Sequence, residues 1–299
     1  MNLGSCNICP HQCGVNRFKG QKGFCKAGAD ILVSHIGLHF GEEPPISGTK
    51  GSGTIFFGHC NLRCVFCQNY QISQPAHDFQ LDQIKPDRLA TEMLILKHQG
   101  AHNINLVSPT HFLPQIIESL KIARNNGLTI PIVYNTNAYE ETASLKYLKG
   151  LIDIYMPDIK YSDDKNAEKY SGIKNYTKKS QAAISEMFTQ VGDLTPDRNG
   201  VARKGLLVRH LVLPNDLAGS KKCLRFLAGL SKDMYISIMS QYSPQFKAYN
   251  FPQLNREITN KEYETVTDYA LKLGLENCFI QEPSSSNQYL PDFEKKNPF

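Results

Sequence analysis

Short apolar runs alternate with longer amphipathic stretches along most of this chain, beginning at Thr54. The apolar runs predict strands at 54–58, 103–107, 131–136, 152–156, 206–213 and 235–239. The amphipathic stretches predict helices at 86–98, 112–126, 140–149, 163–190 in pieces, 219–231 and 259–273. A last apolar run, 278–282, fits either a late strand or a plug. This alternation indicates repeated βα units around a parallel sheet.

Parallel strands joined by crossover helices can form an open doubly wound sheet or a full or partial (β/α) barrel. Both architectures bind ligands at the carboxyl ends of the strands. Residues 1–53 lack this periodicity and are rich in Cys and Gly, so we expect an irregular cap held together by metal. The polar tail after residue 282 contains prolines and is expected to be irregular.

Composition narrows the function classes. The chain has 299 residues, of which 41% are hydrophobic, enough for a sizeable core. The net charge of +5 is spread without a basic block, which makes nucleic acid an unlikely partner. No apolar run is long enough to cross a membrane or to act as a signal peptide, so we expect a cytoplasmic protein. Seven of the nine cysteines fall in the first 67 residues, which in a reducing compartment favours metal binding.

The stretch "GHCNLRCVFCQNY" (58–70) places Cys60, Cys64 and Cys67 directly after the first predicted strand. Thiolates are soft ligands that suit zinc or iron–sulfur clusters. A structural zinc site needs four ligands. Three cysteines can instead hold three corners of a cubane cluster and leave one iron open to a substrate. His59 is adjacent, so a zinc site with three cysteines and one histidine is the rival interpretation.

Cys6, Cys9, Cys13 and Cys25 form a second group, with the spacing C-x2-C-x3-C-x11-C. Four thiolates would complete a closed site, either tetrahedral zinc or a second [4Fe–4S] cluster. Either metal would hold together a segment that has little core of its own. The following stretch "HFGEEPPISG" (39–48) carries two glutamates that either line the barrel entrance or form a solvated turn.

The three-cysteine loop, with Phe66 before its last cysteine, resembles the radical S-adenosylmethionine (SAM) superfamily. In that superfamily the open iron of a [4Fe–4S] cluster chelates the amino and carboxylate groups of SAM, and reductive cleavage yields a 5′-deoxyadenosyl radical. The stretches "VSPTHFLPQI", "YNTNAYE", "DIYMPDIKY", "VRHLVLPN" and "IMSQYSP" resemble pyruvate-formate-lyase-activating-enzyme-like proteins. The N-terminal "CNICPHQCGVNRFKGQKGFC" is similar to the hallmark of a PflX-type branch of that group.

The resemblance implies a partial (β/α)6 barrel at 51–282, after a Cys-rich metal-binding segment at 1–50 and before a tail at 283–299. It also implies an oxidoreductase that takes electrons from a flavodoxin or ferredoxin. The substrate is unknown, and a partner protein or peptide activated at a glycine is one expectation. The alternative is a zinc-stapled module that binds nucleic acid or protein without radical chemistry.

The same resemblance assigns cofactor contacts to single residues. Phe66 matches the position near the adenine, while Asp158 and Lys160 match the strand-four pair that holds the cofactor. His210 matches a strand-five histidine that contacts the ribose or carboxylate, and Arg209 is expected to face the other way.

Two further matches are less direct. Asn135 and Thr136 align with a stretch that binds a monovalent cation beside the cofactor, although Asn135 replaces an aspartate there. A GGE-type motif is missing after strand two, so we expect Ser108, Thr110 or His111 to bind the cofactor amino group instead.

Overall fold

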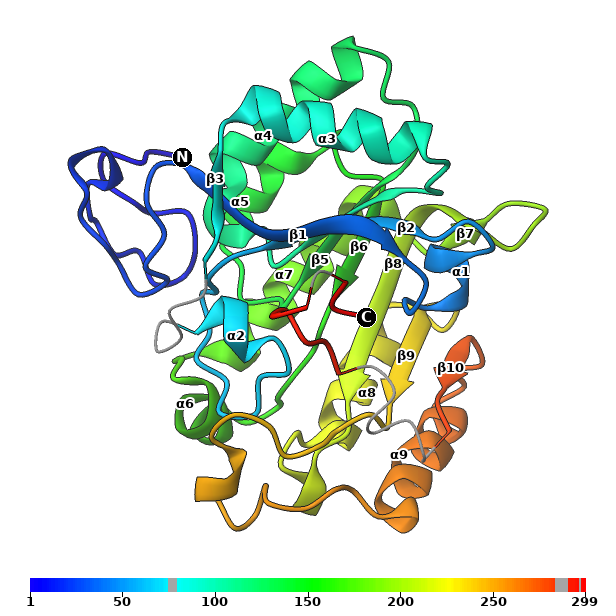
Figure 1. The fold of residues 1–299 in the computed structure, drawn as a ribbon. Coiled ribbons are helices and arrows are strands. Elements are labelled where there is room, and N and C mark those ends of the chain that lie inside the picture. The colour runs from blue at the N-terminus through cyan, green and yellow to red at the C-terminus, as the bar shows by residue number, and fades with distance from the viewer. Residues whose placement is uncertain (75–79, 283–289, 296) are drawn as a thin grey trace.

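The structure is a computed structural model that describes residues 1–74, 80–282, 290–295 and 297–299. Within these ranges one ten-stranded sheet has the order β10-β9-β8-β6-β5-β4-β2-β1-β3, and β7 pairs with β8 beside it (Figure 1). The strands are β1 (Ile31–His39), β2 (Ser52–Phe57), β3 (Asp82–Ile84), β4 (Ile104–Val107), β5 (Ile132–Thr136), β6 (Ile154–Pro157), β7 (Thr195–Pro196), β8 (Ala202–Leu211), β9 (Tyr235–Met239) and β10 (Cys278–Ile280).

Helices follow the parallel strands, as the alternating pattern predicts. They are α1 (Pro44–Ser47), α2 (Tyr70–Ser73), α3 (Pro86–His98), α4 (Leu113–Asn125), α5 (Thr142–Leu145), α6 (Asp164–Ser171), α7 (Tyr176–Val191), α8 (Ser220–Leu230) and α9 (Asn260–Lys272). Pro86 occupies the first turn of α3, where its missing N–H costs nothing. The mixed α/β fold with an open sheet, like a partial barrel, is confirmed, and the run at 278–282 contributes a strand.

The parallel part of the sheet runs from β2 through β4, β5, β6, β8 and β9 to β10. One large apolar cluster fills the space between these strands and the helices, with Tyr134, Tyr155 and Leu106 fully buried in it. A smaller cluster on the opposite face includes Ile46 and Ile154. Both faces of the strands are therefore apolar, as expected for parallel strands covered on each side.

The N-terminal segment is more ordered than the sequence suggests. Residues 31–39, expected to be irregular, form β1, which pairs antiparallel with β2 from Val33↔Phe57 to His39↔Ser52. Only Ile31 and Val33 of this strand are buried, so polar residues interrupt the apolar alternation that would have predicted it. The strand closes one edge of the parallel sheet.

The first thirty residues form a loop-rich lobe beside the sheet (Figure 1). Arg17 Nη1 donates to the carbonyl oxygen of His111 at 2.6 Å, and Ser144 Oγ donates to that of Ile8 at 2.7 Å. These bonds fix the lobe to the segments that follow β4 and β5. Among the described residues, no helix is long and apolar enough to span a bilayer.

Candidate active site at the carboxyl ends of the parallel strands

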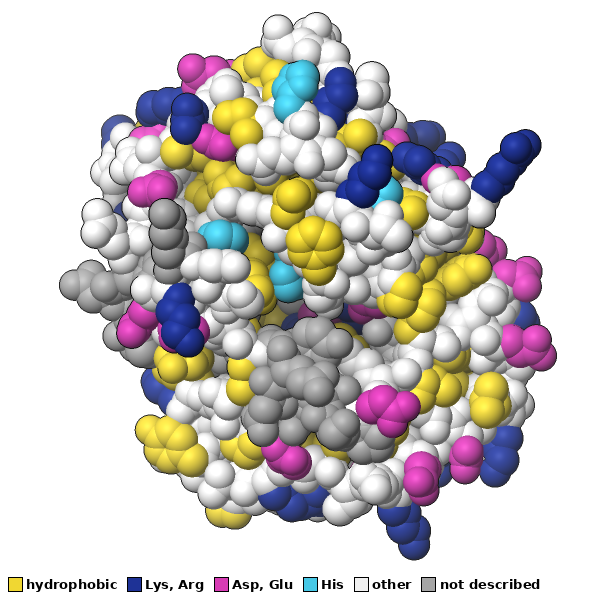
Figure 2. All heavy atoms as spheres, turned by 45° about the vertical axis from the view of Figure 1, so that its right-hand side comes forward, with side chains coloured by type: hydrophobic (Ala, Val, Ile, Leu, Met, Phe, Trp, Pro, Cys, Tyr) yellow, Lys and Arg dark blue, Asp and Glu magenta, His cyan; other side chains and the backbone are white. Residues whose placement is uncertain are grey.

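A cavity of about 620 Å³ opens at the carboxyl ends of the parallel strands. Figure 2 shows this hollow, with charged side chains visible at its bottom. Its wall includes all three cysteines of the loop after β2, and the C-terminal Phe299 contributes to its rim. Predicted cofactor contacts that line it are Phe66, Ser108, Asn135, Thr136, Asp158 and Lys160.

Cys60, Cys64 and Cys67 converge because the loop after β2 turns back on itself. Arg63 supports the turn, since its Nη1 donates to the carbonyl oxygens of Cys60 and Leu62, both at 2.9 Å. The thiols influence one another electrostatically, and the ammonium group of Lys160 acts on two of them.

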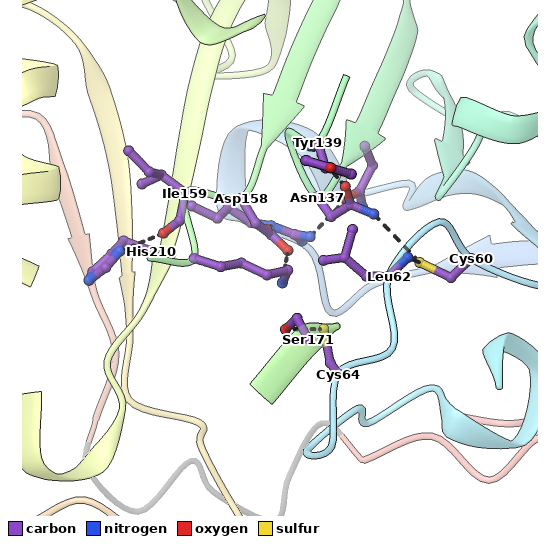
Figure 3. Close-up of polar contacts among 12 residues, drawn as sticks. Cys60, Leu62, Cys64, Asn137, Tyr139, Asp158, Ile159, Ser171 and His210 are labelled. Carbon is purple, nitrogen blue, oxygen red and sulfur yellow. Dashed lines mark hydrogen bonds and ion pairs between the residues drawn. The ribbon is translucent and has the colours of Figure 1, made fainter. Parts of the chain in front are cut away.

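Each of these sulfurs has polar neighbours. The backbone N–H of Leu62 and the Asn137 amide donate to Cys60 Sγ at 3.3 and 3.5 Å. Ser171 Oγ donates to Cys64 Sγ at 3.0 Å (Figure 3), and Ser73 Oγ lies 3.2 Å from Cys67 Sγ. Hydrogen bonds to sulfur are among the features that set the reduction potential of a cluster. The sequence contains no signal for the Asn137 and Ser171 donors, because both come from distant segments.

Burial raises the pKa of Cys60 to about 11 and that of Cys64 to about 12, and Lys160 acts in the opposite direction. The thiols of Cys60 and Cys64 are therefore protonated unless a metal binds them as thiolates. Three convergent sulfurs beside N–H and O–H donors fit a [4Fe–4S] cluster that three cysteines hold. Among the described side chains, no group of three or more ligands is close enough to hold a single metal ion.

Asp158 lies at the centre of a buried ion network. Its Oδ2 accepts from Lys160 Nζ at 2.7 Å, and its Oδ1 accepts from Arg209 Nε at 2.8 Å (Figure 3). Arg209 also donates to Glu42 Oε2 at 3.2 Å and to Asn135 Oδ1 at 2.8 Å. Although burial acts in the opposite direction, Arg209 and Lys160 hold the pKa of Asp158 below its usual value. Asp158 is thus a charged anchor for both cations.

The structure reverses the predicted roles of two neighbours on β8. Arg209, expected to face outward, lines the cavity. His210 faces the other side, where Nδ1 lies 2.7 Å from the carbonyl oxygen of Ile159 and Nε2 lies 2.8 Å from Ser220 Oγ (Figure 3). Both ring nitrogens have protein partners, so His210 is a satisfied buried residue, and it is not among the described residues that line the cavity.

Other predicted residues also have partners outside the cavity. The hydroxyl groups of Thr110 and Thr136 donate to the buried carboxyl of Glu140. Burial raises the pKa of Glu140 to about 7, although these hydroxyls act in the opposite direction. His111 Nε2 lies 2.8 Å from the carbonyl oxygen of Gly58. Of the three candidates after strand two, Ser108 alone lines the cavity among the described residues.

Glu42 and Glu43 lie at the opposite end of the cavity from the cysteines. They follow β1, whose last residue pairs with the first residue of β2. The turn into α1 therefore closes the amino-terminal end of the parallel strands, and the glutamates lie at the cavity floor rather than at the barrel entrance or in a solvated turn. The sequence showed the two residues but not the strand that carries them there.

The four N-terminal cysteines gather in the lobe. Arg17, which is 3% exposed, donates through Nη2 to Cys6 Sγ at 3.1 Å and to Cys25 Sγ at 3.6 Å. The backbone N–H of Phe24 donates to Cys13 Sγ at 3.4 Å. Burial is the main cause that raises the pKa of Cys25, and Arg17 opposes it.

Comparisons with known proteins agree with this geometry. A sequence profile of the radical SAM superfamily matches residues 54–192. The chain is 32% identical over 284 residues to the uncharacterized protein MJ0674 of Methanocaldococcus jannaschii, covering 91% of this chain and 76% of that protein.

Two solved structures share the fold. SuiB of Streptococcus suis, bound to S-adenosylmethionine, gives a TM-score of 0.52 at 16% identity, covering 75% of this chain and 48% of SuiB. HydG, the FeFe-hydrogenase maturase of Carboxydothermus hydrogenoformans, gives 0.50 at 14% identity, covering 78% and 54%. The chain thus spans about half the length of these two proteins.

Proposed function

This chain belongs to the radical SAM superfamily, and we propose that it cleaves SAM reductively to abstract hydrogen from a substrate held in the cavity. Members of this superfamily use a [4Fe–4S] cluster and SAM. The observation that carries the proposal is the convergence of Cys60, Cys64 and Cys67 at one end of a cavity whose other walls carry buried charges. This arrangement provides a ligand set and an enclosed space for the radical.

Cys60, Cys64 and Cys67 would hold the cluster, which would supply the one electron needed to cleave SAM to methionine and, after hydrogen transfer from the substrate, 5′-deoxyadenosine. Lys160 offers a cation for the SAM carboxylate, and Asp158 holds that lysine in place. Phe66 packs edge-on against Tyr161 and Tyr242, which fixes its ring at the cavity wall beside the proposed adenine site. Asn135 orients Arg209 rather than completing a cation site, because its Oδ1 accepts from that guanidinium.

A glycyl-radical-activase-like reaction on a partner protein is the narrower version of this proposal. The strand-end motifs support it, and so does a cavity open at the carboxyl ends of the strands. The test is incubation with candidate partner proteins that carry deuterium at glycine Cα. Deuterium in 5′-deoxyadenosine would support the activase reaction, and unlabelled product with every partner would contradict it.

The N-terminal cysteines form a second metal site in this proposal. Arg17 is buried among their sulfurs with no carboxylate within hydrogen-bonding distance in the described residues. A buried cation is costly unless an anion compensates it, and metal-bound thiolates would supply that negative charge. Zinc and a second [4Fe–4S] cluster would both supply this charge, but a single zinc ion would require the thiols to lie closer together than they do in the structure.

The decisive experiment is anaerobic reconstitution with iron and sulfide, followed by reduction with dithionite in the presence of SAM. We expect a brown protein that forms 5′-deoxyadenosine, detected by chromatography. The physiological reductant would be a flavodoxin or ferredoxin, and replacing dithionite with either protein tests that step. A colourless protein that binds only zinc and leaves SAM intact would contradict the proposal and favour a zinc-stapled binding module.

A further inference from the structure

More acidic than basic side chains line the cavity among the described residues. Among the described residues that line it, the carboxylates are Glu42, Glu43, Asp158 and Glu282, and the lysine and arginine side chains are Lys160 and Arg209. Histidine does not correct the difference, because burial lowers the pKa of His39, the histidine at the wall. Burial raises the pKa of Glu42 and Glu43, and a positively charged ligand beside them would favour their ionised forms.

The excess is concentrated at the floor. Arg209 and Lys160 are both paired with Asp158, and Arg209 also reaches Glu42. Neither cation forms an ion pair with Glu43, and the buried Oε2 of that residue has no hydrogen-bond partner.

A second acceptor without a partner lies in the same network. Asn105 is 0% exposed, and its amide nitrogen donates to Glu42 Oε1 at 2.7 Å. That donation fixes the amide so that its oxygen is an acceptor, and this buried Oδ1 also has no partner. Of these two residues only Glu43 lines the cavity among the described residues, so its unpaired oxygen is the acceptor that favours a ligand with an N–H donor. Burial raises the pKa of Glu43, while the charge of Arg209 opposes that rise.

The amino group of SAM is accounted for elsewhere. The cysteine loop follows Phe57, whereas the glutamates adjoin the pairing of His39 with Ser52, at the other end of β2. At the usual rise per residue, this six-residue strand is about 17 Å long. SAM bound to a cluster at the three cysteines would have its amino group at the cysteine end, which would leave the floor for the substrate.

We propose that Glu43 binds an ammonium or guanidinium group of the substrate at the cavity floor, which makes the substrate an amine or guanidine compound, free or as a side chain of a peptide. This inference rests on the proposed radical SAM function for the identity of the ligand as substrate. Glu43 would fix the cationic end of the substrate and leave its other end toward the SAM site, where hydrogen is removed. Glu42 is a positioning residue, since it holds Arg209 and Asn105 around the floor.

The test uses the reconstituted full chain and two probes of similar size, n-butylammonium and n-butanol, with binding followed by calorimetry or saturation-transfer NMR. We expect the amine to bind the wild type at least tenfold more tightly than it binds Glu43→Gln. The alcohol should show no such difference between the two proteins. Glu118→Gln makes the same chemical change on the exposed face of α4 and should bind the amine as the wild type does.

The outcomes separate this inference from the proposed function. Formation of 5′-deoxyadenosine by Glu43→Gln shows that the variant is folded and that the radical SAM function stands. The inference fails if the amine and the alcohol then bind with equal affinity, or if the amine binds Glu43→Gln as tightly as it binds the wild type. In either case the floor holds only water. If Glu43→Gln weakens SAM binding tenfold, Glu43 belongs to the SAM site and the inference also fails. Amine binding without any SAM cleavage would support a cationic ligand and contradict the radical SAM proposal alone.

Discussion

The two cysteine groups are built from the same ligand but in different surroundings. Cys60, Cys64 and Cys67, here called the barrel group, lie in the loop after β2 (the barrel loop) and line a cavity that also contains Lys160. Among the described residues, none of the N-terminal cysteines lines this cavity. In the lobe, Arg17 instead reaches two sulfurs and a backbone carbonyl. Cysteines that line a cavity suit a cluster that reacts with a ligand, whereas cysteines enclosed in the lobe suit a metal that stays bound for structural support. The surroundings of the sulfurs, rather than their spacing alone, therefore indicate which task each group performs.

The two segments that carry these cysteines also contact each other. Arg63, within the barrel loop, lies 4.6 Å above the ring of Phe24 in the lobe and donates to its carbonyl oxygen. His11 stacks on the same ring at 3.8 Å and lies 2.9 Å from the carbonyl oxygen of Asn61. The lobe therefore supports the back of the loop that presents the three cysteines.

The largest expected effect separates the groups by metal content. We expect Cys64→Ala to lose the iron of one cluster, about four per chain, together with all formation of 5′-deoxyadenosine. Cys25→Ala should lose the lobe metal while retaining iron in the barrel group. Metal analysis and product chromatography on the same samples check both outcomes. Cys223→Ala is the matched control, because Cys223 is 1% exposed in the core and should keep both metals. Equal metal loss in Cys64→Ala and Cys223→Ala would break the comparison.

The second prediction concerns the cation of the lobe. Arg17→Leu removes a buried guanidinium from beside two sulfurs, which leaves negative charge uncompensated and costs about 3–5 kcal/mol of unfolding free energy. The measurement is chemical unfolding of the reconstituted protein, combined with the rate of metal release to a chelator. Arg88→Leu, at a surface ion pair with Glu92, should cost less than about 1 kcal/mol. Similar costs for the two variants would mean that the lobe sulfurs carry no charge.

The third prediction uses Glu140, the buried carboxyl that contributes to the raised pKa of Cys9 in the lobe. Because burial raises its pKa to about 7 in the folded state, folding takes up a proton between the unfolded value and about 7. The free energy of unfolding therefore falls as pH rises from the unfolded pKa of Glu140 to about 7, by about 3 kcal/mol in all. Glu140→Gln should gain this amount relative to the wild type from about pH 4 to about pH 8. Unfolding midpoints measure the trend, and the exposed Glu264→Gln should show none of it.

Sequence reasoning predicted the strands well because apolar runs bounded by turns are a local signal. It also placed Asp158 and Lys160 in the cavity, since residues two apart in an extended segment share a face, and both lie just after β6. It was wrong about Arg209 and His210 because both faces of a covered parallel strand are apolar, so the pattern of β8 does not tell which face is inside. The position of Glu42 and Glu43 at the cavity floor was not predicted, for a different reason. Their position depends on β1. The apolar and polar residues of β1 alternate only weakly, so the sequence does not predict its long-range pairing with β2.

The smallest expected effect tests the open character of the barrel group. Lys160→Met keeps much of the volume and removes the cation that lies between Asp158 and the cysteines. We expect the KM for SAM to rise about tenfold, the loss of one charge-assisted hydrogen bond, with iron content unchanged. Asp158 stays paired with Arg209 in this variant, so the network itself should remain folded. If iron is lost while the KM of the remaining enzyme is unchanged, Lys160 serves the cluster rather than SAM. The two groups would then be alike, each with thiolates held by one buried cation.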